Sequence, residues 1–387
     1  MRILITQREL IHWGGSQMFT IEVAKELSNR GHEVAVFCPR VGDLAKIIFP
    51  SGVWVKDRLS EIPWEPDIIH GQHHLQVVAA LSYFVNVPAI YYCHGARPWA
   101  EQAPPHPRIR YYVMICDWMV TPNATEFGIP RDRMTVIPNF VNMTRFSRVR
   151  NPAVHPRRAL LFGNKGFRAG ELSRLETACQ DLGISLDKVG YPYGNPQERP
   201  EAFLPDYDLV FALGRCAVEA IACGCAVIPI VPGQAGELVT MANFQNWVSS
   251  NFSPIYGTCA TQIDTQWLKR ELTNYSPAIT SQVTAKLRSE HDMRNAVDKI
   301  EAIYKAAIDD YKNTAKPIAA EFAPYLERMS LEVDAMWERE KTAKRQAERI
   351  ERLNQEIRAI RSSTSWRLSK PIRVIGSIFR RRRADEP

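Results

Sequence analysis

The sequence predicts an α/β protein made of two Rossmann-like domains, followed by a helix and a basic tail. Short apolar runs alternate with helical patterns from residue 1 to about 140, and the alternation resumes after a polar, proline-interrupted stretch at 151–158. Such alternation is typical of parallel sheets covered on both faces. A heptad pattern begins near Leu326. The predicted parts are one domain over 1–150, a second over 151–316, a coiled-coil helix over 317–361 and an amphipathic tail over 362–387.

The composition indicates a globular chain with well-buried cores. The 387 residues are 45% hydrophobic and 24% charged, which suits two domains of ordinary size. The opening MRILITQ lacks the basic and long apolar regions of a secretory signal, and polar residues and a proline interrupt the most apolar stretch, 77–92. We therefore expect neither a signal peptide nor a transmembrane helix. The eight cysteines form no C-x-x-C pair, so we interpret them as reduced thiols of a cytosolic protein.

The expected elements alternate in both domains. The first domain begins with the strand RILIT, a helix over about 16–30 that ends at Gly31, and the strand EVAVFC. Its later strands are DIIHG, AIYYCHG, YYVMIC and MTVIPN. The second domain continues through RALLFGN, a helix over ELSRLETACQDLG, LDKVG, YDLVFAL, a helix around Glu219 and AVIPIV. Helical signals then resume over about 281–312.

A pair of glycines follows the first predicted strand. In open α/β sheets, ligands bind beyond the carboxyl ends of the strands, so the turns there are candidate sites. Gly14 and Gly15 lie between the first strand and its helix, where the missing side chains let backbone N–H groups approach a phosphate. An ordinary tight turn is the alternative, because the G-x-G-x-x-G spacing of a dinucleotide site is missing.

Two histidines are predicted at the same edge. His73 follows the strand PDIIH and His94 follows AIYYC, so either imidazole can donate to a sugar hydroxyl or stabilise a phosphate. The alternative is a histidine that caps a helix or packs in the core, which we favour for His70 and His74. No carboxylate has a spacing that would complete a metal site here, so we expect no metal.

The second domain supplies candidate diphosphate and ribose ligands. Lys165 and Arg168 stand among glycines after a strand, which suits a diphosphate, although an exposed turn lysine is the alternative. Gly214 and Arg215 open the next helix, so their N–H groups and the positive helix end would face an anion. A buried carboxylate is costly without a partner or a ligand, and Glu219, one turn later, could bind a diol through its two oxygens. Together these residues describe a site for a nucleoside diphosphate.

The chain resembles GT-B glycosyltransferases of the glycosyl transferases group 1 type, a retaining family that uses nucleotide-diphosphate sugars. The most specific stretch is LPDYDLVFALGRCAVEAIACGCAVI, which resembles the family's nucleotide-binding segment. GGSQMFTIEVAKELSNRGHEVAVF resembles its Gly-rich loop and first helix, and PDIIHGQHH and YYCHG resemble its acceptor-side histidine segments. FGIPRDRMTVIPNFVN resembles the stretch that closes the first domain. MANFQNWVSSNF is similar to bacterial envelope-polysaccharide members, and the whole resemblance covers about residues 1–312.

The resemblance implies roles for several residues and also shows two departures. It implies ribose binding by Glu219 and diphosphate binding by Lys165 and the Gly214 turn. The family often has two glutamates spaced E-x7-E, but Phe211 stands where the first acid would be. The usual Arg and Lys pair of the donor site is compressed here to Lys165 and Arg168.

These observations lead to three functional hypotheses. The first is a cytosolic, metal-independent retaining hexosyltransferase that needs no cofactor and moves a sugar from a UDP- or GDP-sugar to a membrane-held glycan or lipid-linked acceptor. In it, Lys165 stabilises the leaving diphosphate, His94 lies near the reacting carbon, and His73 is on the acceptor side. The second is a catalytically impaired sugar-nucleotide-binding scaffold that organises a membrane assembly, motivated by Phe211. The third is a nucleotide-sugar epimerase.

The last part of the chain predicts partners. One heptad seam with Asn354 at a core position favours a homodimer, and a solvated helix lying on its own domain is the alternative. Between Arg361 and Arg383 there are eight basic residues and no acidic one. An apolar face with Trp366 accompanies them, so we expect the tail to bind an anionic membrane surface, not nucleic acid, at the inner face of the cell membrane. The other seam residues are Met329, Val333, Met336, Ala343, Ala347, Ile350 and Ile357.

Overall fold

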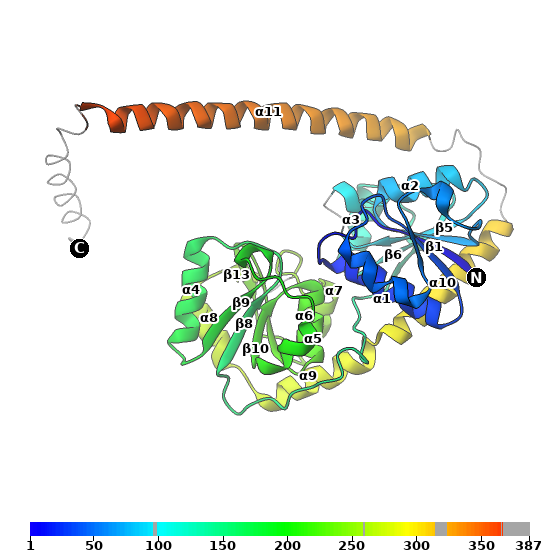
Figure 1. The fold of residues 1–387 in the computed structure, drawn as a ribbon. Coiled ribbons are helices and arrows are strands. Elements are labelled where there is room, and N and C mark those ends of the chain that lie inside the picture. Colours follow the sequence, from blue (N-terminus) through cyan, green and yellow to red (C-terminus); the bar gives the residue numbers. More distant parts are fainter. Residues whose placement is uncertain (96–98, 258–259, 314–322, 365, 367–387) are drawn as a thin grey trace. The chain divides into compact units, whose positions relative to one another are not determined.

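The chain divides into two compact units, Met1–Ile318 and Ala319–Pro387. The computed structural model describes all residues except 96–98, 258–259, 314–322, 365 and 367–387 (Figure 1). The first unit contains two separate β-sheets with helices around each, and the second contains the long helix α11 (Ala323–Ser362). This arrangement confirms two Rossmann-like α/β domains followed by a long helix.

The first sheet has seven parallel strands in the order β3-β2-β1-β4-β5-β6-β7. Its central strands are buried throughout because helices cover both faces, as their continuous apolar sequences predict. Helices α1 (Gly15–Asn29), α2 (His74–Tyr83) and α3 (Val120–Thr125) lie in the connections. The strands are β1 (Arg2–Thr6), β2 (Glu33–Phe37), β3 (Trp54–Lys56), β4 (Ile68–Gly71), β5 (Ala89–Cys93), β6 (Ile109–Met114) and β7 (Met134–Val136).

The second sheet has the order β13-β12-β11-β10-β8-β9. Four strands are parallel: β8 (Arg158–Phe162), β9 (Ser185–Val189), β10 (Leu209–Ala212) and β11 (Ala226–Val231). The short strands β12 (Gln234–Gly236) and β13 (Ala260–Gln262) extend it antiparallel, which the sequence analysis did not predict. The helices of this part are α4 (Ala169–Gln180), α5 (Pro200–Phe203), α6 (Gly214–Ala222), α7 (Phe244–Ser249), α8 (Thr265–Thr273) and α9 (Pro277–Glu290).

Helix α10 (Met293–Lys312) follows the second sheet in sequence but packs against β4, β5 and β6 of the first sheet. Figure 1 shows it in yellow beside the blue strands. Val297 and Ile300 on its apolar face are fully buried in the first core. The Tyr304 hydroxyl lies 2.6 Å from Nδ1 of His70 at the end of β4. His70 is therefore a core histidine, and burial lowers its pKa to about 3.

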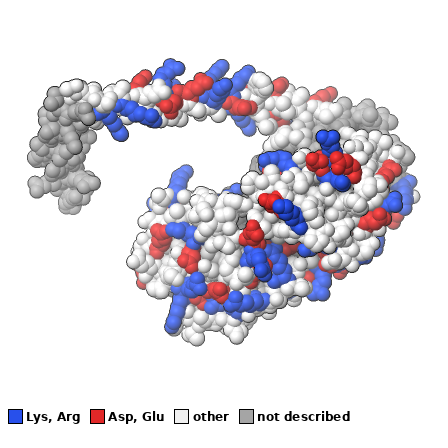
Figure 2. Space-filling model, in the orientation of Figure 1, with Lys and Arg blue, Asp and Glu red and all other residues white. Residues whose placement is uncertain are grey.

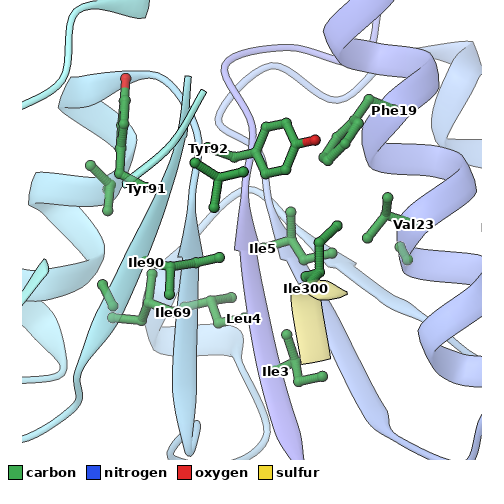
Figure 3. Close-up of a cluster of buried hydrophobic side chains, with 14 of the residues drawn as sticks. Ile3, Leu4, Ile5, Phe19, Val23, Ile69, Ile90, Tyr91, Tyr92 and Ile300 are labelled. Carbon is green, nitrogen blue, oxygen red and sulfur yellow. The ribbon is translucent and has the colours of Figure 1, made fainter. Parts of the chain in front are cut away.

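The core of the first sheet forms because β1 and β5 place large aliphatic and aromatic side chains against α1 and α10. Phe19 of α1 lies 4.3 Å from the Tyr92 ring, centroid to centroid, and both rings are buried. Burial of a side chain of this size contributes roughly 1.5–3 kcal/mol to folding. Figure 3 shows the cluster around Ile3, Leu4, Ile5, Phe19, Val23, Ile69, Ile90, Tyr91, Tyr92 and Ile300.

Helix α11 is exposed along most of its length. Figure 2 shows lysine, arginine, aspartate and glutamate side chains mixed along it. Several seam residues, such as Val333, Met336 and Ile350, are among its exposed apolar side chains. The basic tail predicted over 362–387 falls almost wholly outside the described residues. Among the described helices, none is long and apolar enough to cross a membrane.

Candidate active site

A central cavity of about 320 Å³ gathers five of the residues singled out from the sequence: Gly15, His94, Lys165, Gly214 and Arg215. They come from the carboxyl ends of β1, β5, β8 and β10, where open α/β sheets bind their ligands. The other lining residues are Ser16, Glu101, Ile115, Asn139, Phe162, Gly163, Asn164, Leu213, Cys216 and Asn251.

A second, smaller cavity of about 90 Å³, here called the lateral cavity, is lined in part by the same residues and adds Gly14 and Glu219. Trp13, Met18, Phe162 and Tyr191 give it an apolar wall. The backbone N–H of Trp13 donates to the Tyr191 hydroxyl at 2.9 Å and so links the two residues of this wall. His73 and Arg168 line neither cavity.

The first helix points its N-terminus at both cavities. Gly14 is the N-cap of α1, and a Cβ there would lie 2.4 Å from Oε1 of Gln17, whereas a Cβ on Gly15 would meet nothing within 4 Å. The first N–H groups of a helix have no partner within the helix, and the helix dipole favours negative charge there. The position of Gly15 in the wall therefore suits an anion.

Helix α6 presents a second N-terminus to the central cavity. Gly214 has φ +56, a left-handed conformation that favours glycine, and its N–H donates to the Asn251 carbonyl at 3.1 Å. The Gly214 N–H that the sequence analysis assigned to an anion is therefore already bonded. An anion at this helix would meet the N–H groups that follow in the first turn.

Glu219 has a protein partner. Its Oε1 accepts a hydrogen bond from Nε of Arg215 at 2.7 Å, and the Arg215 guanidinium also pairs with Glu22 of α1. All three side chains are at most 10% exposed. Burial raises the pKa of Glu219, although Arg215 opposes the shift. The buried acid is thus part of a charge network that still forms the wall of the lateral cavity.

This network extends to a second arginine. Nη1 of Arg145 lies 3.0 Å from Glu22, and its Nη2 lies 2.8 Å from Glu201 of α5. Arg145 also lines the lateral cavity. Glu22 therefore lies between two arginines and joins α1 of the first sheet to α6 of the second. Sequence patterns gave no signal for Glu22, because its partners are distant in the chain.

The two predicted cations of the β8–α4 loop differ in position. Lys165 is exposed and lies in the wall of the central cavity, where an ammonium group would attract a phosphate. Arg168 is the N-cap of α4, and its backbone N–H donates to Oε2 of Glu171 at 2.8 Å. The structure therefore brings Lys165, and not Arg168, to the cavity.

His94 is held as a neutral imidazole. Its Nε2 lies 2.6 Å from Oε1 of Gln72, and the Phe19 ring packs on it edge-on at 4.7 Å. Burial lowers the pKa of His94 to about 4. Because the amide oxygen can only accept, Nε2 carries the proton and Nδ1 remains an acceptor. His94 can therefore accept a hydrogen bond from a hydroxyl, but it carries no positive charge for a phosphate near neutral pH.

His73 caps α2 in an unusual backbone conformation. It is a non-glycine residue with φ 59, it is buried, and its Nε2 lies 3.4 Å from Oε1 of Glu101. Glu101 lines the central cavity although the sequence gave no signal for it. Asn139 and Asn251, whose side chains meet at 2.6 Å, are further cavity residues that sequence reasoning missed.

The D-x-D sequence at 206–208 is engaged in ion pairs with arginines. Asp206 pairs with Arg148 and Asp208 with Arg150. Asp208 also accepts the N–H groups of Arg157 at 2.8 Å and of its neighbour in β8 at 2.9 Å. Within the described part of the chain, no three acidic, histidine or cysteine side chains gather as a metal site.

Solved glycosyltransferase structures share the fold of this chain. A glycosyltransferase from Rickettsia africae ESF-5 superposes with a TM-score of 0.60 at 15% identity, over 81% of this chain and 99% of that chain. Anabaena HepE in complex with UDP-glucose also superposes with a TM-score of 0.60 at 15% identity, over 79% of this chain and 100% of that chain. HepE in complex with UDP and glucose superposes with a TM-score of 0.55 at 14% identity, over 79% of this chain and 100% of that chain. No curated protein sequence matches the chain.

A family model matches the N-terminal part of the chain. Residues 13–145 match Glycosyltransferase Family 4, a segment that begins beside Gly14 and ends at Arg145, both in the wall of the lateral cavity. The two sheets, together with structural matches that cover 81% and 79% of this chain, give the GT-B fold to the first unit as a whole. The chain therefore has the GT-B fold, and its residues 13–145 are similar to Glycosyltransferase Family 4.

Proposed function

We propose that the protein is a retaining glycosyltransferase that moves a sugar from a UDP- or GDP-sugar to a membrane-associated glycan or lipid-linked acceptor in cell-envelope polysaccharide synthesis. The observation that carries the proposal is the central cavity, in which the N-termini of α1 and α6 and the ammonium group of Lys165 surround one space. Two helix ends and a lysine favour a diphosphate. The complex of Anabaena HepE with UDP-glucose adds support from the same fold.

The lateral cavity suits the nucleoside part of the donor. Its apolar wall around Trp13 and Tyr191 can cover a base, and Glu219 supplies a carboxylate that can accept hydrogen bonds from ribose hydroxyls. Arg215 holds that carboxylate in place through the bond of 2.7 Å. We therefore assign nucleoside binding to the lateral cavity and diphosphate binding to the central cavity.

The transfer step follows from this placement. The acceptor hydroxyl oxygen forms a bond to C1 of the sugar while the bond from C1 to the diphosphate oxygen breaks, and the hydroxyl proton passes to the leaving diphosphate. Lys165 and the helix ends stabilise the charge that develops on the diphosphate. His94 accepts a hydrogen bond from a sugar hydroxyl through Nδ1 and so fixes the sugar near the reacting carbon. The proposed enzyme uses no metal ion or cofactor.

We further propose that the enzyme is cytoplasmic and bound to the inner face of the membrane as a homodimer. The exposed seam of α11 supports a coiled-coil contact between two copies, since apolar residues at heptad spacing are buried when two such helices pair. The basic sequence of the tail supports attraction to anionic lipids.

The first experiment asks whether the chain binds a nucleotide sugar. UDP, GDP, UDP-glucose and GDP-mannose are titrated against the full-length protein, and the melting temperature is followed, because a ligand that binds only the native state raises it. The Glu219→Ala variant is expected to weaken nucleotide binding. If no nucleotide shifts the melting temperature, or if Glu219→Ala binds as tightly as wild type, the site assignment is wrong.

A scaffold that binds nucleotide sugars without transferring them is the second candidate. It is favoured by Phe211, which is fully buried where an acid is often found. Product analysis distinguishes the two functions. The scaffold would bind the donor but form neither glycoside nor free sugar, and an epimerase would convert the donor without an acceptor.

A further inference from the structure

The acid Glu101 in the wall of the central cavity is not explained by the proposed donor site. It is the last residue of the 3-10 helix Trp99–Glu101, which follows β5 in sequence, and the Tyr91 hydroxyl donates to its backbone carbonyl at 3.2 Å. The side chain is only 18% exposed. Its Oε1 meets Nε2 of His73, but among the described residues its Oε2 has no hydrogen-bond partner, and neither does Nδ1 of His73. Buried polar atoms are rarely left without partners, so these two indicate a group that is added from outside.

The charge of Glu101 limits which substrate group can bind to its Oε2. Burial by itself would raise the pKa of Glu101, but the hydrogen bond and charge of His73 bring it below its usual value, so the side chain is an anion near neutral pH. An anion would repel the diphosphate that Lys165 and the helix ends attract. Glu101 therefore serves a part of the substrate that donates hydrogen bonds and carries no negative charge.

His94 also offers a hydrogen-bond acceptor to the cavity. His94 lies in the same cavity and presents an acceptor nitrogen, since its Nε2 is bonded to Gln72. Glu101 and His94 therefore place two acceptors on the wall built by the first domain, whereas Lys165 and the N-termini of α1 and α6 attract an anion elsewhere around the same cavity. A pyranose ring with several hydroxyl donors, attached to or facing a diphosphate, matches this distribution.

We propose that Glu101, positioned by His73, binds a hydroxyl group of a pyranose in the central cavity. The inference rests on the proposed function and names one further residue that binds the sugar substrate. His73 holds Oε1 of Glu101, which leaves Oε2 to accept from the substrate. The strained backbone of His73, with φ 59, is consistent with a residue kept in place for a positioning role. The hydroxyl belongs to the donor sugar or to the acceptor, and the experiment separates the two.

The test compares Glu101→Gln with wild type in the full-length protein. The variant keeps the shape of the side chain but removes its charge. Calorimetry measures binding of UDP, of UDP-glucose, and of octyl β-D-glucoside to the UDP-saturated protein. We expect UDP affinity to be unchanged, while affinity for UDP-glucose relative to UDP, or affinity for the glucoside, falls about tenfold or more. A loss for UDP-glucose assigns the hydroxyl to the donor sugar, and a loss for the glucoside assigns it to the acceptor.

Two further variants make the test specific. Glu65→Gln makes the same chemical change at an exposed position of the first domain that lines neither cavity, and it should bind all three ligands as wild type does. His73→Gln should weaken the same ligand as Glu101→Gln. The double variant should lose no more than Glu101→Gln alone, because His73 acts through the carboxylate.

Two results would overturn the proposal. One is that Glu101→Gln binds all three ligands as wild type does. The other is that it loses UDP affinity in proportion to the other losses, which would make Glu101 a nucleotide ligand or a purely structural residue. If wild type binds none of UDP, UDP-glucose, GDP and GDP-mannose, the proposed function fails and this inference fails with it. If wild type binds only the guanosine ligands, GDP and GDP-mannose replace UDP and UDP-glucose in the same comparison.

Discussion

Replacing Arg215 should destabilise the protein more than replacing either of its acidic partners alone. Arg215 is the shared cation of Glu22 and Glu219, and all three side chains are at most 10% exposed. Arg215→Met leaves Glu219 charged, buried and unpaired, whereas Glu22 keeps Arg145 at 3.0 Å. Removing one partner of a buried ion pair costs roughly 3–5 kcal/mol of the free energy of unfolding.

Glu219→Gln should lower the free energy of unfolding less than Arg215→Met does. The amide can still accept from Arg215, and Arg215 keeps Glu22, so no buried charge loses its only partner. A weakened buried hydrogen bond costs about 1–3 kcal/mol. In the double variant Arg215→Met, Glu219→Gln, the unpaired charge is gone, and the loss should be smaller than the sum of the two single losses.

The pH dependence of the Arg215→Met effect provides a check with a defined sign. Burial already raises the folded-state pKa of Glu219 above the usual 4.5, and loss of Arg215 raises it further. The loss in free energy of unfolding that comes from the Glu219 charge is therefore absent below the pKa of Glu219 in the unfolded chain. It grows as the pH rises through the pKa of Glu219 in the folded protein. Urea unfolding of both variants and wild type at pH 5 and pH 8 measures this. If Arg215→Met is no less stable than Glu219→Gln, or if its deficit does not grow with pH, Arg215 is not the cation that keeps Glu219 charged.

Four further outcomes are expected. Burial lowers the pKa of His94 to about 4, below the usual 6.5, so stability should fall as the pH falls between these values; His94→Gln should flatten this slope in urea unfolding, and the exposed His155→Gln should not. Lys165→Ala should lower turnover about 10²–10³-fold with little change in UDP affinity, and equal turnover would remove it from the proposed mechanism. Light scattering should show fewer subunits for a chain ending at Lys316 than for the full chain. Sedimentation with anionic liposomes at low salt should be lost on deletion after Arg361, and unchanged sedimentation would contradict a role of the tail.

Local sequence patterns predicted the two sheets because each strand is an apolar run bounded by turn residues. They did not predict where α10 packs, since an amphipathic pattern shows that a face is buried but not which sheet buries it. The antiparallel strands β12 and β13 were missed for a related reason. Each has only three residues, too few for an alternating pattern to be recognised.

The candidate site was predictable where it depends on topology. Residues that follow parallel strands meet at one edge, so Gly15, His94 and Lys165 were expected together and lie around one cavity. Their roles stay predictions until they are tested. The partners that decide the electrostatics come from tertiary contacts. Glu22 is 193 residues from Arg215 in sequence, and α2 and β5 separate His73 from Glu101. No local pattern connects such residues.

The missing acid at position 211 does not by itself indicate lost catalysis. Phe211 lies in β10, is fully buried, and packs in the cluster that includes Leu175 of α4 and Leu268 of α8. A carboxylate on that side chain would be buried in an apolar core at high cost, and it would not line either cavity. The first residue after β10 that lines the central cavity is Leu213. Any acid that the sugar requires must therefore come from another element, and Glu101 on the first sheet's wall is an acid that the structure places in the cavity.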